Sequence, residues 1–231
     1  MKKTAKKSKR KQQKRETNWK VIGGVVVISG LVLFGMIFLA FREPNQLDLI
    51  KYCDNNPENC IASGPDTAAA RMVEVSDYGC THCRTFNLET APLLEETYGN
   101  NDNFQHLAMP YALSGQSGGY PTMDSAVAAF CANEQNKFWE YHAATFALQT
   151  SPSFNTEEGI LQTGENIGLD LDSFKSCLAN NEYENNVRAN IRAATNAGIN
   201  STPSFMIDGQ VLAGAQPFTV FQQRIESLLS Q

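Results

Sequence analysis

Two cysteines separated by two residues, Cys80 and Cys83, form the stretch of this 231-residue chain that is best suited to chemistry. The same spacing also builds half of many zinc sites. The flanking residues favour redox chemistry instead, because the apolar run 69–75 predicts a strand and the segment 81–98 predicts an amphipathic helix. Cys80 would therefore stand at a helix N-terminus, where unpaired backbone amides and the helix dipole stabilise a thiolate.

The setting of the pair predicts different roles for its two members. We expect Cys80, at the helix start, to be the nucleophile and Cys83 to be the resolving, more buried thiol. The imidazole of His82 can stabilise a neighbouring thiolate by its charge or by a hydrogen bond. Zinc would need further ligands close by, and His106 and His142 show no ligand spacing with the two cysteines. We therefore expect a redox-active Cys80–Cys83 disulfide, with no metal and no other cofactor.

The order of the predicted elements describes an α/β domain. Alternating residues at 103–109 predict a second strand, and two short apolar runs around Asp208-Gly209 predict a β-hairpin at about 204–213. Helices are expected from Asp124 onward and at 156–167, 172–180, 183–197 and 217–229, with Gly168 and Gly198 as stops. This order predicts a small sheet flanked by helices, with a helical subdomain inserted at about 120–197.

Charge is distributed unevenly along the chain. Residues 1–20 hold ten of the 19 Lys and Arg residues but only one of the 24 acidic residues, Glu16. The remainder, 21–231, has nine basic and 23 acidic residues, a net charge of −14, although the whole chain is at −5. Such an acidic body would be repelled by phosphates, which argues against nucleic-acid binding. The basic tail has the composition of a disordered segment, and we expect it to be cytoplasmic.

The apolar segment 21–41 predicts a single transmembrane anchor. It contains no charged residue, and its 21 positions at about 1.5 Å each give about 31 Å of helix, enough to cross a bilayer core. Because basic residues precede it, the N-terminus is expected in the cytoplasm and the remainder outside the cell membrane. A cleaved signal peptide is the alternative, but the segment is long for a signal core and lacks a small-residue cleavage site.

Residues 42–64 predict an extracytoplasmic linker, because they are polar and contain Pro, Gly and several Asn. A short helix near 47–51 is the one regular element expected there. Cys53 and Cys60 enclose six residues, which suits a small structural disulfide outside the cytoplasm. A second redox pair is the alternative, although no strand and helix frame these two cysteines.

Three stretches of the chain resemble the DsbA-like thiol:disulfide oxidoreductases of the thioredoxin superfamily. They are residues 74–83, 128–142 and 198–205. Their order and spacing are similar to the family's over about 61–231. The resemblance implies a thioredoxin-like fold for 65–231, a central mixed sheet flanked by helices with the helical insertion, preceded by the transmembrane helix. Thr81 stands where the family often has Pro, in a dipeptide that tunes the redox potential.

The resemblance also implies roles outside the C-x-x-C. Thr202-Pro203 matches the family's cis-proline loop, which faces the cysteines and binds an extended substrate through the Thr202 backbone. Glu74 matches the family's buried acid, a proton shuttle for the resolving thiol, with a solvent-facing strand carboxylate as the alternative. Cys131 and Cys177 both fall in the predicted insertion, so a disulfide is their simplest pairing in an oxidising compartment, with two buried free thiols as the alternative.

Together these features predict a membrane-tethered, monomeric enzyme that oxidises dithiols of exported proteins to disulfides. The resemblance implies reoxidation by a quinone-linked membrane partner of the DsbB or VKOR type, near which the anchor would raise the domain's effective concentration. A reductase or isomerase on the same fold is the first alternative, although an isomerase of this superfamily generally brings a dimerisation domain. A tethered assembly factor with purely structural cysteines is the alternative from a different class.

Overall fold

The computed structural model describes residues 47–113, 115, 119–180 and 182–231. The basic tail and the transmembrane anchor predicted at 1–20 and 21–41 lie outside the described residues. Within the described ranges, no helix is both long enough and apolar enough to cross a membrane.

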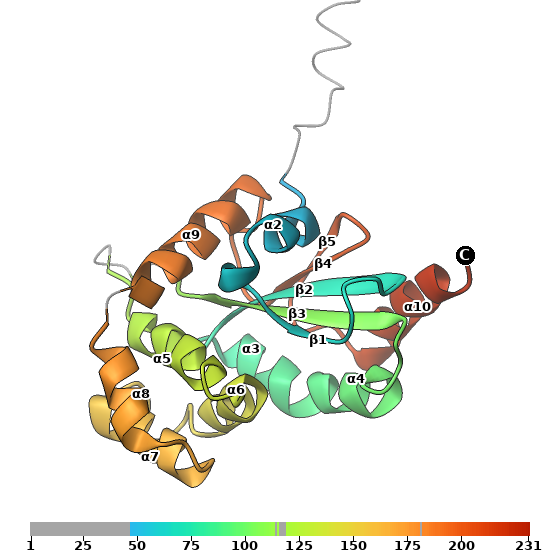
Figure 1. Ribbon diagram of the computed structural model, residues 1–231. Helices are drawn as coiled ribbons and strands as arrows, with labels where there is room; N and C mark the ends of the chain where they lie inside the picture. Colours follow the sequence, from blue (N-terminus) through green and yellow to red (C-terminus); the bar gives the residue numbers. More distant parts are fainter. Residues whose placement is uncertain (1–46, 114, 116–118, 181) are drawn as a thin grey trace, which may run out of the picture. The chain divides into compact units, whose positions relative to one another are not determined.

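A five-stranded mixed sheet forms the centre of the described region (Figure 1). Its strand order is β1-β3-β2-β4-β5, with β2 parallel to β3 and the other neighbours antiparallel. The strands are β1 (Ile61–Ser63), β2 (Ala70–Asp77), β3 (Phe104–Tyr111), β4 (Ser204–Ile207) and β5 (Gln210–Ala213). The predicted α/β class, with a central mixed sheet that includes the β4-β5 hairpin, is confirmed.

The helices agree closely with the predicted segments. They are α2 (Leu49–Asn55), α3 (Thr81–Thr85), α4 (Ala91–Tyr98), α5 (Met123–Asn133), α6 (Phe138–Ala147), α7 (Glu157–Asn166), α8 (Leu171–Leu178), α9 (Glu182–Asn196) and α10 (Phe218–Leu229). Gly168 and Gly198 follow α7 and α9 with φ of +79° and +76°. Glycine enters this left-handed region without the steric cost of a Cβ, which is why both residues end helices as predicted.

Both faces of the sheet are covered, because successive residues of β2 point to opposite sides. Val73 and Val75 point toward α2 and α9, where they are fully buried. Met72 points to the other face, where it packs with residues of α4 and α10. Figure 1 shows α2 and α9 on one side of the sheet and α3 and α4 on the other. Glu74 lies between Val73 and Val75, so its carboxylate is directed into the protein on the Met72 side.

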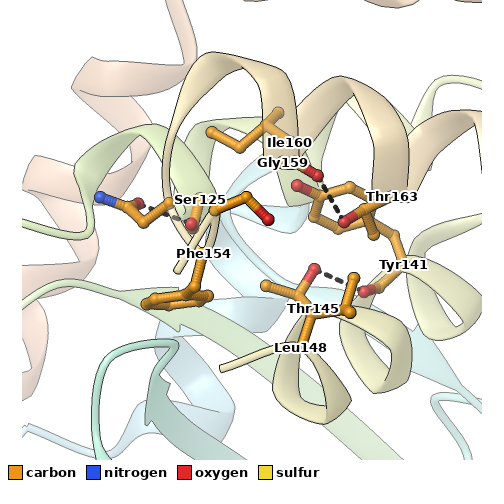
Figure 2. Close-up of a pocket in the computed structure, with 10 residues that line it drawn as sticks. Ser125, Tyr141, Thr145, Leu148, Phe154, Gly159, Ile160 and Thr163 are labelled. Carbon is orange, nitrogen blue, oxygen red and sulfur yellow. Dashed lines mark hydrogen bonds between the residues drawn. The ribbon is translucent and has the colours of Figure 1, made fainter. Parts of the chain in front are cut away.

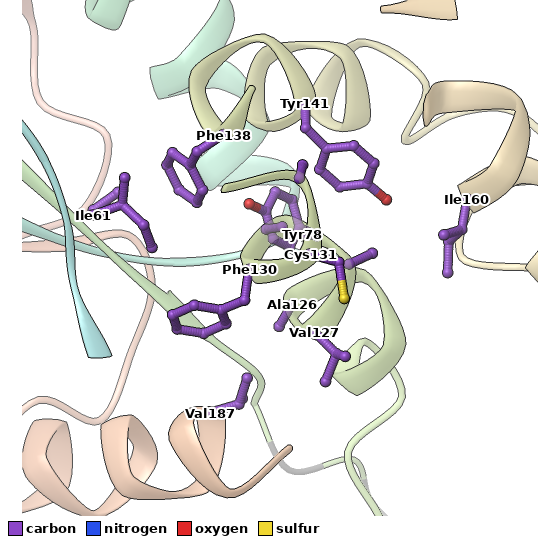
Figure 3. Packing of buried hydrophobic residues seen from close by; sticks show 14 of the residues in the cluster. Ile61, Tyr78, Ala126, Val127, Phe130, Cys131, Phe138, Tyr141, Ile160 and Val187 are labelled. Carbon is purple, nitrogen blue, oxygen red and sulfur yellow. The ribbon is translucent and has the colours of Figure 1, made fainter. Parts of the chain in front are cut away.

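The helical subdomain has its own core beside the sheet. Aromatic side chains are buried there, among them Phe130 of α5 and Phe138 of α6 (Figure 3). Phe174 of α8 belongs to the same cluster. Tyr141 of α6 reaches toward α7 and lines a small pocket (Figure 2). The predicted insertion also includes α9, but this helix packs its Ala194 face on β3 and thereby covers the sheet itself.

The short helix expected near 47–51 is present as α2, but the linker predicted at 42–64 is wrong from residue 47 onward, because 47–63 are part of the folded domain. This segment contains α2, the short 3₁₀ turn η1 (Pro57–Asn59) and β1. Leu49 is fully buried, and Ile61 pairs with Ala108 of β3. The few apolar residues of this segment are too sparse to form a periodic pattern. Its backbone is held by α9, where the Asn190 side chain donates to the carbonyl oxygen of Asn59 at 2.9 Å.

The single helix predicted at 81–98 contains a wider turn in its middle. Between α3 and α4 the chain forms a π-helical segment, η2 (Phe86–Thr90). Such segments interrupt the regular i→i+4 pattern and are frequent near functional sites. Here the wide turn carries Asn87, whose side chain is buried behind the cysteines.

Candidate active site

Cys80 and Cys83 lie in the first turn of α3, just after the C-terminal end of β2. Cys80 is the N-cap residue, with an extended backbone at φ −82° and ψ 120°, and its Sγ accepts a hydrogen bond from the backbone N–H of Cys83 at 3.4 Å. Both cysteines are free thiols; Cys80 is partly exposed and Cys83 is fully buried. The more accessible thiol therefore stands at the helix start, and the other faces the core.

Several donors around Cys80 favour its thiolate. The largest effect is a hydrogen bond from the Cys83 thiol, which outweighs the partial burial that acts against the charge. The Thr202 side chain and the backbone N–H groups of Cys83 and His82 act in the same direction, so the pKa of Cys80 falls to about 5. In the thiol form, Cys80 Sγ instead donates to the Thr202 carbonyl oxygen at 3.2 Å. That bond favours the thiol, but one acceptor does not balance the several donors.

The surroundings of Cys83 have the opposite effect. Burial raises the pKa of the Cys83 thiol far above its ordinary value, and the hydrogen bond to Cys80 and the charge on Cys80 raise it further. At neutral pH the pair therefore holds one negative charge, on Cys80, and one proton, on Cys83. In this protonation state the exposed Cys80 sulfur can act as a nucleophile, while the buried Cys83 sulfur stays protonated.

Thr81 and His82, between the two cysteines, are both exposed. His82 contributes to the lowered pKa of Cys80 through its backbone N–H, after the larger effect of the Cys83 thiol. The His82 side chain is exposed. Stabilisation of the Cys80 thiolate by its imidazole stays a prediction. The tuning role expected for Thr81 stays a prediction as well.

The Thr202-Pro203 peptide bond is cis, and the loop that contains it lies against Cys80. Its position follows from the sheet: β4 begins at Ser204, which pairs with Val75 of β2, so the residues before β4 lie beside the end of β2 where the cysteines begin. The Ser204 hydroxyl donates to the Ser201 carbonyl oxygen at 2.8 Å and holds the loop. Two segments more than 100 residues apart in sequence thus meet at the Cys80 sulfur.

The turn from β2 into α3 is fixed by Asp77, which the sequence interpretation did not single out. Its carboxylate accepts from the Gly79 N–H at 2.6 Å, from the Thr122 hydroxyl at 3.0 Å and from the Leu113 N–H. Burial raises the pKa of Asp77 in spite of these bonds. A Cβ at Gly79 would lie 2.7 Å from Cγ2 of Thr122, so any larger residue in this turn would force the Thr122 side chain to shift. The Asp-x-Gly pattern is a turn signal that could have been used.

Glu74 is fully buried and surrounded by donors, so the solvent-facing alternative is wrong. Its carboxylate accepts from the Ser76 hydroxyl, from Asn87 Nδ2 at 3.0 Å and from His106 Nε2 at 2.9 Å. Nε2 of His142 lies 3.7 Å away. Burial alone would raise the pKa of Glu74, but the hydrogen bond with His106 and the nearby imidazoles of His142 and His106 outweigh burial and hold it well below its ordinary value.

Asn87 connects Glu74 to the cysteines. The same Nδ2 that donates to Glu74 also donates to the carbonyl oxygen of Cys83, at 3.1 Å. The sequence interpretation missed Asn87 because a regular helix over 81–98 gives no reason to direct it inward. It left His106 and His142 aside because their spacing did not suit a metal. Only the sheet and α6 bring them to Glu74.

The other four cysteines form two disulfides. Cys53 and Cys60 join α2 to the start of β1, with Cα atoms 5.6 Å apart. Cys131 and Cys177 join α5 to α8, with Cα atoms 5.7 Å apart. All four side chains are buried, with exposed fractions of 9% or less. Their sulfur atoms are therefore shielded from solvent, unlike that of Cys80.

A mixed sheet of this order, with a C-x-x-C at the helix start after β2 and a cis-proline loop against it, defines a thioredoxin-like protein. The family model described as thioredoxin matches residues 56–227, and the chain belongs to this family. Of the described residues, no group of three or more His, Cys, Asp or Glu side chains is arranged to hold a metal ion.

Curated relatives of the chain differ in kind. The "Probable disulfide bond formation protein D" of Bacillus anthracis is 25% identical over 152 residues, which cover 64% of this chain and 69% of that protein. The "Na(+)/H(+) antiporter NhaA 3" of Salinispora tropica is 27% identical over 159 residues, 67% of this chain. The match covers 22% of the antiporter, so the chain spans about a fifth of that relative's length.

Solved bacterial structures share this fold, as two examples illustrate. Oxidised BdbD from Bacillus subtilis superposes with a TM-score of 0.61 at 18% identity, covering 74% of this chain and 92% of that one. The thiol-disulfide exchange protein α-DsbA2 from Wolbachia pipientis gives a TM-score of 0.62 at 19% identity, covering 78% and 95%. At these identities the likeness concerns the fold.

Proposed function

We propose that the protein is a thiol:disulfide oxidoreductase whose Cys80–Cys83 pair oxidises the dithiols of exported proteins to disulfides. The observation that carries the proposal is the contrast between a stabilised, accessible Cys80 thiolate and a buried Cys83 thiol. Stabilising the reduced pair makes the corresponding disulfide a stronger oxidant. The relative from Bacillus anthracis, named for disulfide bond formation, supports this direction.

The reaction begins with the pair as a disulfide. A substrate thiolate attacks Cys80 Sγ, the Cys80–Cys83 bond breaks, and the Cys83 sulfur leaves and takes up a proton. A second substrate thiolate then attacks the substrate sulfur of the mixed disulfide and releases Cys80 as a thiolate. The substrate has lost two electrons to the pair and has gained a disulfide. The low pKa of Cys80 makes it a good leaving group in this second step.

The Thr202 carbonyl oxygen is proposed to help hold the substrate. It lies 3.2 Å from Cys80 Sγ, at the edge of a loop whose next residue, Pro203, has no N–H. An extended substrate chain that pairs with the Thr202 backbone would bring its own cysteine to Cys80. Recognition through main-chain atoms suits an enzyme that acts on many exported sequences.

Glu74 is proposed to serve the proton exchange of Cys83. Because the pKa of Cys83 is high, its sulfur needs a proton as it leaves. Glu74 is the buried carboxylate on the strand that leads to the cysteines, and because it is ionised it would first accept this proton and then pass it on. Asn87 joins the Glu74 carboxylate to the Cys83 backbone. His106 contacts Glu74 and is itself slightly exposed, which provides a connection toward solvent.

The proposed enzyme is tethered to the membrane and is reoxidised there. Residues 21–41 would anchor a monomeric domain to the outer face of the cell membrane, with the basic residues 1–20 in the cytoplasm. The reduced pair would pass its two electrons to a quinone-linked membrane protein of the DsbB or VKOR type. The pair's own disulfide is the only redox group required.

The reduction potential of the Cys80–Cys83 pair tests the direction of the reaction. The protein would be equilibrated with glutathione buffers, and the oxidised fraction would be measured by alkylation and mass spectrometry. We expect a value well above the −270 mV typical of thioredoxin, roughly −120 to −180 mV. A value near −270 mV would indicate a reductase instead. A pair that does not exchange with a dithiol peptide at all would indicate a tethered assembly factor.

A further inference from the structure

One face of α6 is directed at the turn that carries Cys80. His142, Phe146 and Gln149 are spaced i, i+4 and i+7, so they lie along the same side of the helix and its C-terminal end. All three contact Tyr78. Nδ1 of His142 is 2.8 Å from the Tyr78 hydroxyl oxygen, and the Phe146 and Tyr78 ring centroids are 4.9 Å apart. Nε2 of Gln149 donates to the Tyr78 carbonyl oxygen at 2.6 Å.

Gln149 also reaches the nucleophile's own backbone. The same Nε2 donates to the Cys80 carbonyl oxygen at 3.0 Å. That oxygen is also the first acceptor of α3, since it accepts the Arg84 N–H at 3.1 Å. One side chain of the helical subdomain thus fixes the peptide groups on both sides of Gly79 and Cys80. Glycine adds backbone freedom at this point, so a clamp across it restricts the turn.

We propose that Gln149 is a positioning residue for Cys80, through which the helical subdomain sets the reactivity of the nucleophile. Orientation matters here because disulfide exchange requires the attacking sulfur to approach along the bond that breaks. Cys80 Sγ must stay aligned with the helix N-terminus, which stabilises it, and with Thr202, where the substrate would lie. Gln149 acts through the backbone and touches neither sulfur. The inference rests on the proposed oxidoreductase function.

A purely structural role for Gln149 makes a different prediction. The turn is also held from the opposite side, where the Asp77 carboxylate accepts from Gly79 and Thr122. If Asp77 alone fixed the turn, loss of Gln149 would lower stability and leave the chemistry of Cys80 unchanged. Measurements of reactivity and stability on the same variants separate the two roles.

The test compares Gln149→Met with Gln135→Met in the full chain. Methionine keeps the length and volume of glutamine but cannot donate. Gln135 is a matched control, because it also bridges to backbone, donating to the Asp170 carbonyl oxygen at 3.2 Å and accepting its N–H at 2.8 Å, within the helical subdomain. The readouts are the rate at which reduced protein attacks oxidised glutathione, the pH midpoint of Cys80 alkylation and the thermal unfolding midpoint.

We expect Gln149→Met to attack oxidised glutathione roughly threefold to tenfold more slowly than wild type, with a higher alkylation midpoint. Gln135→Met should lose thermal stability and keep the wild-type rate and midpoint. The proposal is overturned if Gln149→Met reacts like wild type, or if both variants slow equally. Gln149→Ala replaces it if Gln149→Met does not fold, and failure of both to fold would mark Gln149 as structural. Inactive wild-type protein would instead refute the oxidoreductase function.

Discussion

The cysteines at the start of α3 and those of the two disulfides are the same side chain in two kinds of surroundings. Cys131 and Cys177 are buried between α5 and α8, and their bond closes a separation of 46 residues. Cys80 is partly exposed at a helix N-terminus, with backbone and thiol donors around its sulfur. Sequence spacing alone does not separate these groups. Exposure and the local donors decide which sulfur reacts and which one stabilises the fold.

The largest difference is expected for Cys80→Ser. Serine keeps the size of the side chain but provides no thiolate, so disulfide formation in a dithiol peptide should fall by at least about 1000-fold. The thermal unfolding midpoint of the reduced protein should change little, because this side chain is only partly buried. Peptide oxidation is followed by mass spectrometry. If Cys80→Ser retained a tenth of the wild-type activity, Cys80 would not be the nucleophile.

The converse experiment removes the α5–α8 disulfide through the double substitution Cys131→Ala and Cys177→Ala. From the 46-residue separation, loop-closure entropy predicts a loss of about 4 kcal/mol in the free energy of unfolding. The same changes at Cys53 and Cys60, which are separated by seven positions, should cost about 2 kcal/mol. Urea unfolding measures both. Under conditions where the variants are folded, their rate of peptide oxidation should match that of wild type. A lower rate would contradict the division into reactive and structural cysteines.

A smaller, pH-dependent effect is expected for Glu74→Gln, which keeps the shape and one acceptor oxygen. The folded-state pKa of Glu74 is lowered, so the unfolded chain takes up the proton first as the pH falls. The stability from the ionised form is present above the ordinary Glu pKa of about 4.3 and is lost below it. The difference in unfolding free energy between wild type and Glu74→Gln should therefore shrink from about pH 6 to about pH 3. A constant difference would mean that the pKa of Glu74 is the same in the folded and unfolded states, and a difference that grows as the pH falls would mean that Glu74 is neutral when folded.

Local patterns predicted most of the elements and the setting of the cysteines. A strand, a C-x-x-C and a helix in succession place Cys80 at a helix start, and glycines mark the ends of α7 and α9. The residues around this centre could not be predicted in the same way, because they arrive through tertiary contacts. Gln149 reaches Cys80 from 69 positions away, and His106 reaches Glu74 from 32. The folded segment 47–63 was missed because its burial depends on α9 and β3.

The pH dependence of Cys80 alkylation tests the central claim most directly. The reduced protein, with Cys83→Ser as the check on assignment, would be treated with iodoacetamide over a range of pH, and modification of Cys80 would be followed by mass spectrometry. The account predicts a rate that rises with a midpoint near pH 5 in wild type, because the thiolate persists down to that pH. In Cys83→Ser, whose hydroxyl can still donate to the Cys80 sulfur, the midpoint should stay near the wild-type value, whereas in Cys83→Ala, which has no donor, it should move upward. A wild-type midpoint near 8.5, the ordinary value for a cysteine, would contradict the account.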